Sequence, residues 1–253
     1  MGTVVTFDVC TPAPPEEVQA ALDRCVAWLH WVDETFSTYK PTSEVCRFDR
    51  GELKIADCSD ELRHVIALCH RFNEGTGGYF DAWASGHFDP SGVVKGWSIE
   101  RASSMLAADG LPDHALDGGG DVRLSRPPAS GKPWQVAVRH PLKRDAYCAV
   151  LSLHNGAVAT SGTYERGAHV IDPFAGGPAT ELVSATVVGP DLTTADAYAT
   201  AAIAMGAAAP SWLETLSGYE ALVISPTGRG WSTPRFDQLS VTTLGSRSQP
   251  DGG

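Results

Sequence analysis

Long hydrophobic runs are absent from this chain of 253 residues. No stretch approaches the roughly 18 consecutive apolar residues of a membrane-spanning helix, so we expect no membrane span. The opening residues, MGTVVTFDVC, alternate like a β-strand and lack the basic and apolar segments of a secretory signal. This pattern predicts a cytoplasmic protein.

Basic residues are also scarce. The chain has 19 Lys and Arg against 30 Asp and Glu, which gives a formal net charge of −11. Nucleic acids and anionic membrane surfaces are bound by basic surfaces, so we expect no nucleic-acid partner. An anionic ligand would have to be held by local groups, such as a metal ion, a lysine or a helix terminus.

Common metal-binding and nucleotide-binding signatures are missing as well. The chain has no CxxC pair and no histidine at zinc-finger spacing from a cysteine. Lys95 is followed by Gly96, which excludes a Walker A loop, and Gly118–Gly120 lack the GxGxxG spacing and the helix after it. The cysteines are expected to be small buried thiols, and they are Cys10, Cys25, Cys46, Cys58, Cys69 and Cys148.

The composition, with 43% hydrophobic and 19% charged residues, is that of a folded globular protein. Apolar spacing predicts helices over residues 15–36, 60–73, 92–108, 194–206 and 211–216. Strands are expected over residues 3–9, 121–124, 134–139, 147–153, 157–161, 169–171 and 184–188, with a last one at 221–225. Because helices and strands do not alternate regularly, we predict an α+β fold with a mixed or antiparallel sheet. One domain is expected over residues 1–244, followed by a disordered tail at 245–253.

The run FDPSGVVKGW, residues 88–97, contains the first candidate ligand site. It places Asp89, a Ser91-Gly92 turn and Lys95 at the start of a predicted helix. A helix N-terminus offers unpaired N–H groups and a positive dipole end, and a glycine allows close approach. The arrangement suits a phosphate or diphosphate, although a plain helix start explains it equally well.

Asp196 and Thr200 form the second candidate, because residues four apart share one face of a helix. Oxygen ligands of this kind are what Mg²⁺ prefers. The alternative is structural: Asp196 would stabilise the helix dipole in the first turn, and Thr200 would bond back to the carbonyl of residue 196.

His169 and Ser161 form the third candidate site. The pKa of a histidine suits proton transfer near neutral pH, and the Ser161-Gly162 turn could bring a hydroxyl to a ligand. A structural histidine on a strand is the alternative. Asp172, which precedes Pro173, is expected to fix a turn.

Glycines and aromatic residues supply the last candidates. Gly119 and its neighbours, followed by Asp121, would let a flat or charged ligand approach the backbone. Tyr79 and Phe80 stand directly before Asp81, so they could stack on a ring system that Asp81 hydrogen-bonds. Core packing explains Phe80 as well.

Taken in order, the motifs of the chain resemble those of the ApbE family, the FAD:protein FMN transferases. The resemblance extends from Met1 to about Gly206. The motifs that carry it are MGT, FSTYKPTSE, GGYFD, DPSGVVKGW, GGGDVR, ATSGTYER, HVIDP and SATVVGPDLTTADAYAT.

The resemblance implies a Mg²⁺-dependent transfer of the FMN moiety of FAD to a threonine hydroxyl of an acceptor protein, with release of AMP. The partners would then be FAD and that acceptor protein. The Mg²⁺ ligands would be Asp196, Thr200 and a main-chain carbonyl at about Gly92, and His169 matches the histidine that activates the acceptor. The residues that match FAD contacts are Met1, Tyr39, Tyr79, Phe80, Asp81, Asp89, Lys95 and Ile171.

The chain departs from the family pattern in two places. Only residues 82–88 separate the GYFD motif from the DPSG loop, where members often have more, and Ala199 stands where some members have a second aspartate. Two other activities remain open at this point: a Mg²⁺-dependent FAD pyrophosphatase that yields FMN and AMP, and a non-catalytic FAD-binding protein.

Overall fold

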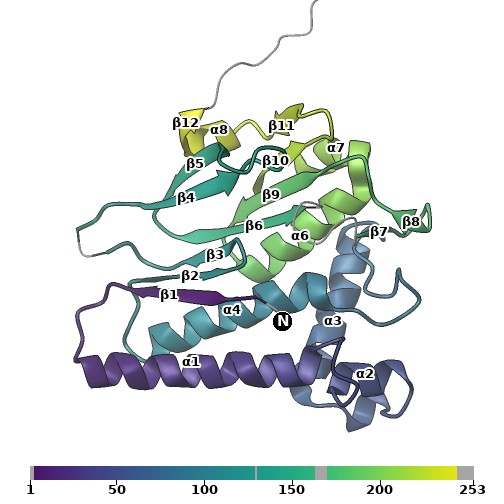
Figure 1. Ribbon diagram of the computed structural model, residues 1–253, viewed down its shortest axis with the longest axis horizontal. Helices are drawn as coiled ribbons and strands as arrows, with labels where there is room; N and C mark the ends of the chain where they lie inside the picture. Colours follow the sequence, from purple (N-terminus) through teal and green to yellow (C-terminus); the bar gives the residue numbers. More distant parts are fainter. Residues whose placement is uncertain (1–2, 129, 163–169, 244–253) are drawn as a thin grey trace, which may run out of the picture.

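The computed structural model describes residues 3–128, 130–162 and 170–243. Figure 1 shows three layers: helices, a large sheet, and a small sheet on the far side of it. The large sheet has seven strands in the order β1-β2-β3-β6-β9-β10-β11, and the pairs are antiparallel. The small sheet has the order β12-β5-β4, and β7 pairs with β8 separately. The predicted α+β class with an antiparallel sheet is confirmed.

The strands of the described residues are mostly short. They are β1 (Val5–Val9), β2 (His114–Gly118), β3 (Asp121–Leu124), β4 (Trp134–Arg139), β5 (Tyr147–Leu153), β6 (Gly156–Gly162), β7 (Ile171–Asp172), β8 (Gly177–Pro178), β9 (Ser184–Gly189), β10 (Glu220–Ile224), β11 (Gly230–Ser232) and β12 (Ser240–Thr243). The prediction for β3, β4 and β5 was correct to the residue. The prediction that the strand at 221–225 is the last was wrong, because β11 and β12 follow it, and β2 was missed.

The helices are α1 (Pro15–Phe36), α2 (Glu44–Asp49), α3 (Asp60–Gly75), α4 (Ser91–Ala108), α6 (Leu192–Met205), α7 (Ala209–Leu213) and α8 (Phe236–Leu239), with short 3₁₀ turns η1 (Ile55–Asp57) and η2 (Gly206–Ala208). The prediction for α1 was correct at both ends. Ser59 caps α3, since its side chain accepts a hydrogen bond from the N–H of Leu62. Residues 44–49, where no helix was predicted, form α2.

Two hydrophobic cores lie on the two faces of the large sheet. The larger one joins α1, α3, α4 and α6 to residues such as Leu116, Ala159 and Val187. The smaller one, which includes Leu124, Val158 and Leu151, lies between the two sheets. Alternation along β6 explains the division, because Val158 and Ala159 point to opposite faces.

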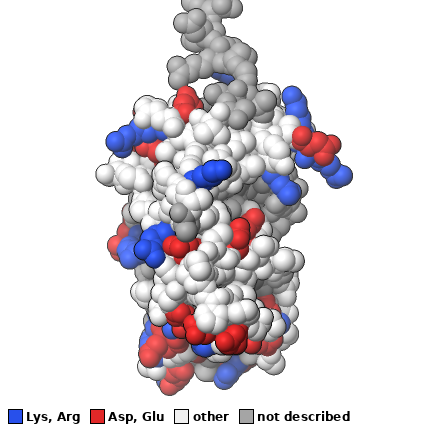
Figure 2. All heavy atoms as spheres, turned by 90° about the vertical axis from the view of Figure 1, so that its left-hand side faces the viewer, with Lys and Arg blue, Asp and Glu red and all other residues white. Residues whose placement is uncertain are grey.

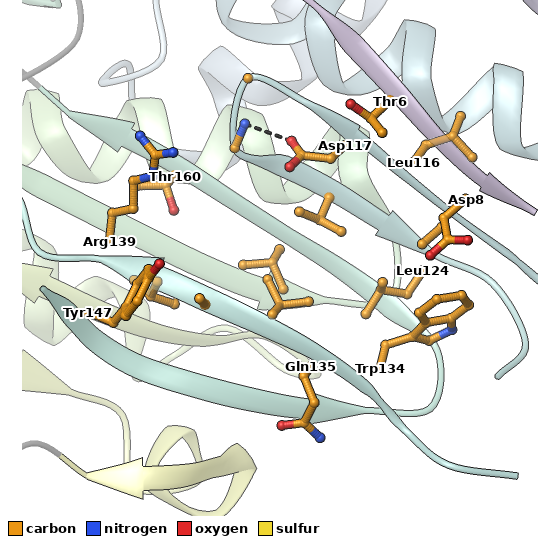
Figure 3. Close-up of a pocket in the computed structure, with 18 of the residues that line it drawn as sticks. Thr6, Asp8, Leu116, Asp117, Leu124, Trp134, Gln135, Arg139, Tyr147 and Thr160 are labelled. Carbon is orange, nitrogen blue, oxygen red and sulfur yellow. Dashed lines mark hydrogen bonds between the residues drawn. The ribbon is translucent and has the colours of Figure 1, made fainter. Parts of the chain in front are cut away.

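A cavity of about 580 Å³ also lies between the sheets, lined by residues of β1, β2, β3, β4 and β6. Figure 3 shows it beside the ribbon of β4.

The described helices include none that is long and apolar enough to cross a lipid bilayer. On the face drawn in Figure 2, basic and acidic side chains of the described residues are interspersed and gather in no broad basic area.

His114 is a buried titratable group in the layer between α4 and β2. Its side chain is 0% exposed, with Nδ1 2.6 Å from the carbonyl oxygen of Leu111 and Nε2 2.7 Å from the hydroxyl of Ser103. These partners suit a neutral ring whose Nδ1–H donates and whose Nε2 accepts. Burial lowers the pKa of His114 below its ordinary value.

We expect this ring to make the protein sensitive to acid. The unfolded chain binds a proton at about pH 6.5, so the contribution of His114 to stability is full above that pH and falls as the pH decreases below it. His114→Asn should lower the free energy of unfolding at pH 7.5 by about 1–3 kcal/mol, through lost hydrogen bonds. It should then lose less stability than the wild type between pH 7.5 and 5.5. Thermal melts at pH 7.5 and 5.5 measure this, with His154→Asn at an exposed position as the control. An equal loss of stability in the wild type and both variants would contradict the prediction.

Candidate functional site

A second cavity, of about 360 Å³, lies where the start of α4, the middle of α6, the β2–β3 turn and the end of β6 meet. Most of the residues singled out in the sequence line it. They are Tyr39, Tyr79, Phe80, Asp81, Asp89, Gly92, Lys95, Gly119, Ser161, Ile171, Asp196 and Thr200. Met1 and His169 lie outside the described residues, so their predicted roles stay predictions.

Lys95 and Asp196, which line this cavity, form a charged cluster with Asp121, which lies behind Lys95 and does not line the cavity itself. The ammonium of Lys95 lies 2.8 Å from Oδ2 of Asp121 and 3.9 Å from Oδ1 of Asp196. Asp121 is 0% exposed and Asp196 is 2% exposed. Three different elements, α4, β3 and α6, therefore bring one cation and two carboxylates together in a buried place.

Backbone groups hold the two carboxylates in position. Oδ2 of Asp196 accepts a hydrogen bond from the N–H of Gly96 at 2.8 Å. Oδ1 of Asp121 accepts one from the N–H of Thr160 at 3.1 Å. One oxygen of each carboxylate is thus used by the scaffold, and the other faces Lys95.

Asp196 does not have the structural role that the sequence left open. The prediction that α6 starts at Thr194 was wrong: α6 begins at Leu192, and Asp191 is its N-cap, accepting from the N–H of Thr194 at 3.3 Å. Asp196 therefore lies in the second turn, beyond the part of a helix where a carboxylate stabilises the dipole. Burial and the charge of Asp121 raise the pKa of Asp196 well above its usual range, while Lys95 and the N–H of Gly96 partly oppose this.

Thr200 lies on the same face of α6, one turn after Asp196. Its hydroxyl lies 3.2 Å from that of Ser161. A Cβ added to Gly92 would come within 3.3 Å of this hydroxyl and within 3.1 Å of the Phe80 ring. The absence of a side chain at Gly92 therefore lets the start of α4 come close to Thr200.

These groups fit a hard divalent cation. When both carboxylates are ionised, the buried pair carries more negative charge than Lys95 offsets; this repulsion contributes to the raised pKa of Asp196, and a bound cation would relieve it. Carboxylate, hydroxyl and carbonyl oxygens are ligands that Mg²⁺ accepts, and Asp196, Thr200 and the start of α4 at Gly92 lie together. Within the described residues there is no cluster of three or more His, Cys, Asp or Glu side chains that could hold a metal, so a histidine- or thiolate-rich centre is not found there.

The residues around the mouth of the cavity divide into exposed and structural ones. Tyr39 is 95% exposed, whereas Phe80 is 3% exposed and belongs to the core, as the alternative interpretation held. Asp89 accepts from the N–H of Ser91 at 3.0 Å and Asp81 from that of Trp83 at 2.8 Å, so both also fix turns. Among the described residues, no further hydrogen bond is found for the other oxygen of either carboxylate.

Asp172 fixes a turn, as the sequence predicted, by accepting hydrogen bonds from the N–H groups of Phe174 and Ala175. The Phe174 ring in that turn contacts Tyr79 edge-on, with ring centroids 4.8 Å apart. The turn therefore supports one wall of the cavity.

Comparison with known proteins identifies the group to which this arrangement belongs. The model of the ApbE family matches residues 1–88 and 82–223. The chain belongs to the ApbE family. Its fold agrees with that of solved ApbE proteins: the flavin transferase ApbE from Vibrio cholerae superposes with a TM-score of 0.81 at 22% identity, covering 94% of this chain and 96% of that one. The ApbE protein from Thermotoga maritima superposes with a TM-score of 0.82 at 23% identity, covering 95% of this chain and 97% of that one.

Curated ApbE relatives share a shorter stretch. The FAD:protein FMN transferase of Salmonella typhimurium is 28% identical over 169 residues, which are 62% of this chain and 48% of that protein. The FAD:protein FMN transferase of Haemophilus influenzae is 32% identical over 131 residues, which are 47% of this chain and 38% of that protein. The matched part of the chain thus spans about half the length, or less, of these relatives.

The short segment at residues 82–88, where the sequence analysis expected a departure from the family pattern, is held by α2. Asp49 at the end of α2 accepts from the N–H of Phe88 at 2.7 Å and lies 3.0 Å from Nδ1 of His87. The Phe88 ring stacks on Trp83, with centroids 4.7 Å apart. Asp49 was not singled out in the sequence, because no helix was predicted there. Ser43, which accepts from the N–H of Cys46 as an N-cap, was the available signal.

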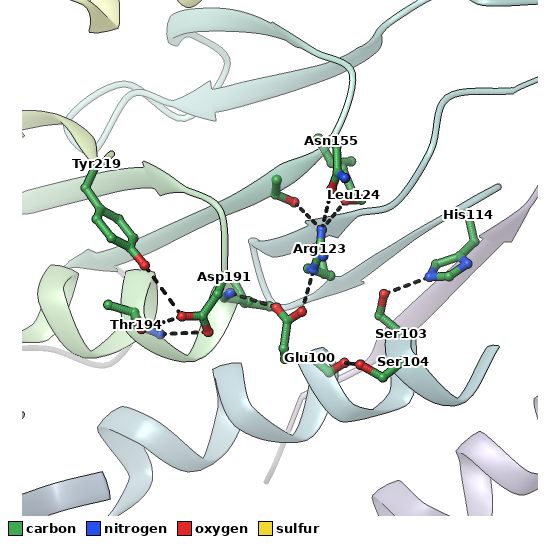
Figure 4. A network of polar contacts seen from close by, with 12 residues as sticks. Glu100, Ser103, Ser104, His114, Arg123, Leu124, Asn155, Asp191, Thr194 and Tyr219 are labelled. Atoms are coloured by element: carbon green, nitrogen blue, oxygen red, sulfur yellow. Dashed lines mark hydrogen bonds and ion pairs between the residues drawn. The ribbon is translucent and has the colours of Figure 1, made fainter. Parts of the chain in front are cut away.

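A polar network fixes the relative positions of the elements that carry the charged cluster (Figure 4). Glu100 on α4 accepts from Nε of Arg123 on β3 at 2.7 Å and from the N–H of Leu192 at 2.8 Å. The guanidinium of Arg123 also donates to Asn155 and to the carbonyl of Gly156. Since Glu100, Arg123 and Leu192 lie on the same elements as Lys95, Asp121 and Asp196, the network sets the spacing of that cluster. Neither Glu100 nor Arg123 was singled out in the sequence.

Proposed function

We propose that this chain is an FAD:protein FMN transferase, which moves the FMN moiety of FAD to a threonine hydroxyl of an acceptor protein in a Mg²⁺-dependent reaction. The observation that carries the proposal is the buried cluster of Lys95, Asp121 and Asp196 beside the cavity. It supports the proposal because Lys95 could bind a phosphate oxygen and Asp196 could hold a metal ion beside the diphosphate. The names of the curated relatives support the same reaction class.

In this reaction, the threonine oxygen forms a bond to the phosphorus of the FMN moiety. The bond from that phosphorus to the oxygen bridging to AMP breaks, and AMP leaves with the electron pair. The threonine proton passes to a base, and His169 remains the predicted candidate. No nucleophile from this chain is required, so positioning and charge account for the catalysis.

The residues of the cavity divide this work. Lys95 stands between the carboxylates and the ligand space, and its side chain is 21% exposed. Its ammonium can therefore reach a phosphate oxygen. Asp196, Thr200 and the carbonyl of Gly92 would hold Mg²⁺. When bound, the ion would neutralise diphosphate charge and polarise the bond to be broken. Tyr39, Tyr79 and Asp81 at the mouth would contact the flavin.

The competing reaction is hydrolysis, in which water replaces the threonine hydroxyl. We expect FAD and Mg²⁺ incubated with the chain alone to yield little AMP, and addition of the acceptor protein to start AMP release. Chromatography of AMP, together with mass spectrometry of the acceptor for an FMN adduct on threonine, measures both products. Rapid AMP release without acceptor would favour a pyrophosphatase. FAD binding without AMP release under either condition would indicate a flavin-binding protein instead.

A further inference from the structure

The cavity between the two sheets has no part in the proposed chemistry, and its shape is that of a groove along a strand. Its volume is about 580 Å³, and all of β4, from Trp134 to Arg139, lines one side. The opposite side is formed by β1, β2 and β3, on the face of the large sheet that turns away from α4 and α6.

The wall formed by β4 is an edge. Among the described residues, β4 is the outer strand of the sheet β12-β5-β4. Its Val136 and Val138 are buried in the smaller core, whereas Gln135, Ala137 and Arg139 are exposed. An outer strand presents unpaired backbone N–H and C=O groups, and an extended peptide can pair with them while its side chains enter neighbouring pockets.

One end of the groove meets the candidate active site. Gly119 and Thr160 line both this cavity and the cavity of the charged cluster. The N–H of Thr160 donates to Asp121, which pairs with Lys95. A chain lying in the groove would therefore arrive at the β2–β3 turn, beside the groups proposed to act on the diphosphate.

The two ends of the groove differ chemically. Trp134 lies at the far end, since its Nε1 donates to the carbonyls of Ser125 and Arg126 just after β3. Figure 3 shows Arg139 and Tyr147 toward the end that also holds Thr160, with Trp134 and Leu124 toward the other. No carboxylate of the described residues comes within ion-pair distance of Arg139, so its charge remains for a ligand.

We propose that this groove binds the acceptor protein, which adds an extended segment to the edge of β4 and presents its threonine at the Gly119–Thr160 end. The inference rests on the proposed function, because only a transferase needs such a partner. The edge backbone, the length of the groove along a whole strand and its continuity with the active site favour a peptide segment over a compact small molecule. Arg139 fits a carboxylate of that segment close to the threonine.

Two substitutions test the groove without touching the active site. Ala137→Trp places a large side chain at an exposed residue of the edge strand that lines the groove, and Arg139→Glu reverses the charge at the end near the active site. Val241→Trp is the matched control, since Val241 is 60% exposed on β12, the opposite edge of the same sheet.

To find the probe, the wild-type chain is incubated with FAD, Mg²⁺ and a lysate of the source organism, and the protein that gains covalent flavin fluorescence is identified. That protein is then purified in its unmodified form and used as the acceptor. We expect Ala137→Trp and Arg139→Glu each to raise KM for this acceptor about tenfold or more, with the affinity for FAD unchanged and Val241→Trp equal to the wild type. Unchanged acceptor KM in both groove variants would overturn the inference. A weakened affinity for FAD in them would also overturn it, since the groove would then serve FAD. If the wild type labels no protein at all, the proposed function fails, and the docking inference fails with it.

Discussion

Asp196→Asn is expected to abolish FMN transfer and AMP release while leaving the fold intact. Asparagine has the same shape and keeps one oxygen that can accept the N–H of Gly96. It removes the negative charge proposed to hold Mg²⁺, so kcat should fall by about 10²- to 10³-fold. Stability should not fall, because the substitution removes one of two like charges that are buried together.

Calorimetry separates this effect from a general loss of binding. In the wild type, FAD should bind more tightly with Mg²⁺ than without it, because the diphosphate completes the coordination of the ion. In Asp196→Asn, the affinity for FAD should be the same with and without Mg²⁺. Asp191→Asn is the control: it removes an aspartate from the start of the same helix, and asparagine is an equally good N-cap. Full transfer activity in Asp196→Asn, or equal loss in Asp191→Asn, would contradict the assignment.

Elements with a strong local pattern could be predicted from the sequence. In α1, Cys25, Leu29 and Val32 form one apolar stripe, and Pro15 occupies a first-turn position that suits it. The strand β2 has no such pattern, because His114 and Asp117 interrupt its apolar residues. It exists because it pairs with β1, more than 100 residues earlier, in a register that local sequence does not express.

The candidate site likewise has a part that local sequence predicts and a part that depends on tertiary packing. Asp196 and Thr200 could be paired from helical spacing alone, and Lys95 from its place at a helix start. Their meeting with Asp121 could not be predicted, because it depends on how α4, β3 and α6 pack. The sequence analysis placed Gly96 within a motif but gave it no role. In the structure its backbone lies so close to α6 that an added Cβ would meet atoms of Leu192 and Asp196.

Gly96→Ala should disrupt both the fold and the site. A Cβ at this position would lie 2.5 Å from the carbonyl oxygen of Leu192 and 2.8 Å from Cβ of Asp196. These atoms belong to the backbone or lie next to it in α6, so they cannot move aside as a flexible side chain would, and α6 must shift as a whole. Overpacking of this kind costs about 1–3 kcal/mol, against a gain of about 1 kcal/mol in helix propensity. The same shift lengthens the hydrogen bond from Gly96 to Asp196 and moves the carboxylate away from Lys95, so transfer activity should fall further than stability does.

Gly75→Ala is the matched control, because Gly75 is also helical and an added Cβ there meets no atom within 4 Å. Urea denaturation should show Gly75→Ala at least as stable as the wild type and Gly96→Ala less stable. Transfer rates measured per folded molecule should then be normal in the first variant and strongly reduced in the second. A Gly96→Ala protein with wild-type stability and activity would mean that α4 and α6 do not approach this closely. The hydrogen bond from Gly96 that holds the Asp196 carboxylate beside Lys95 would then not depend on a glycine at this position.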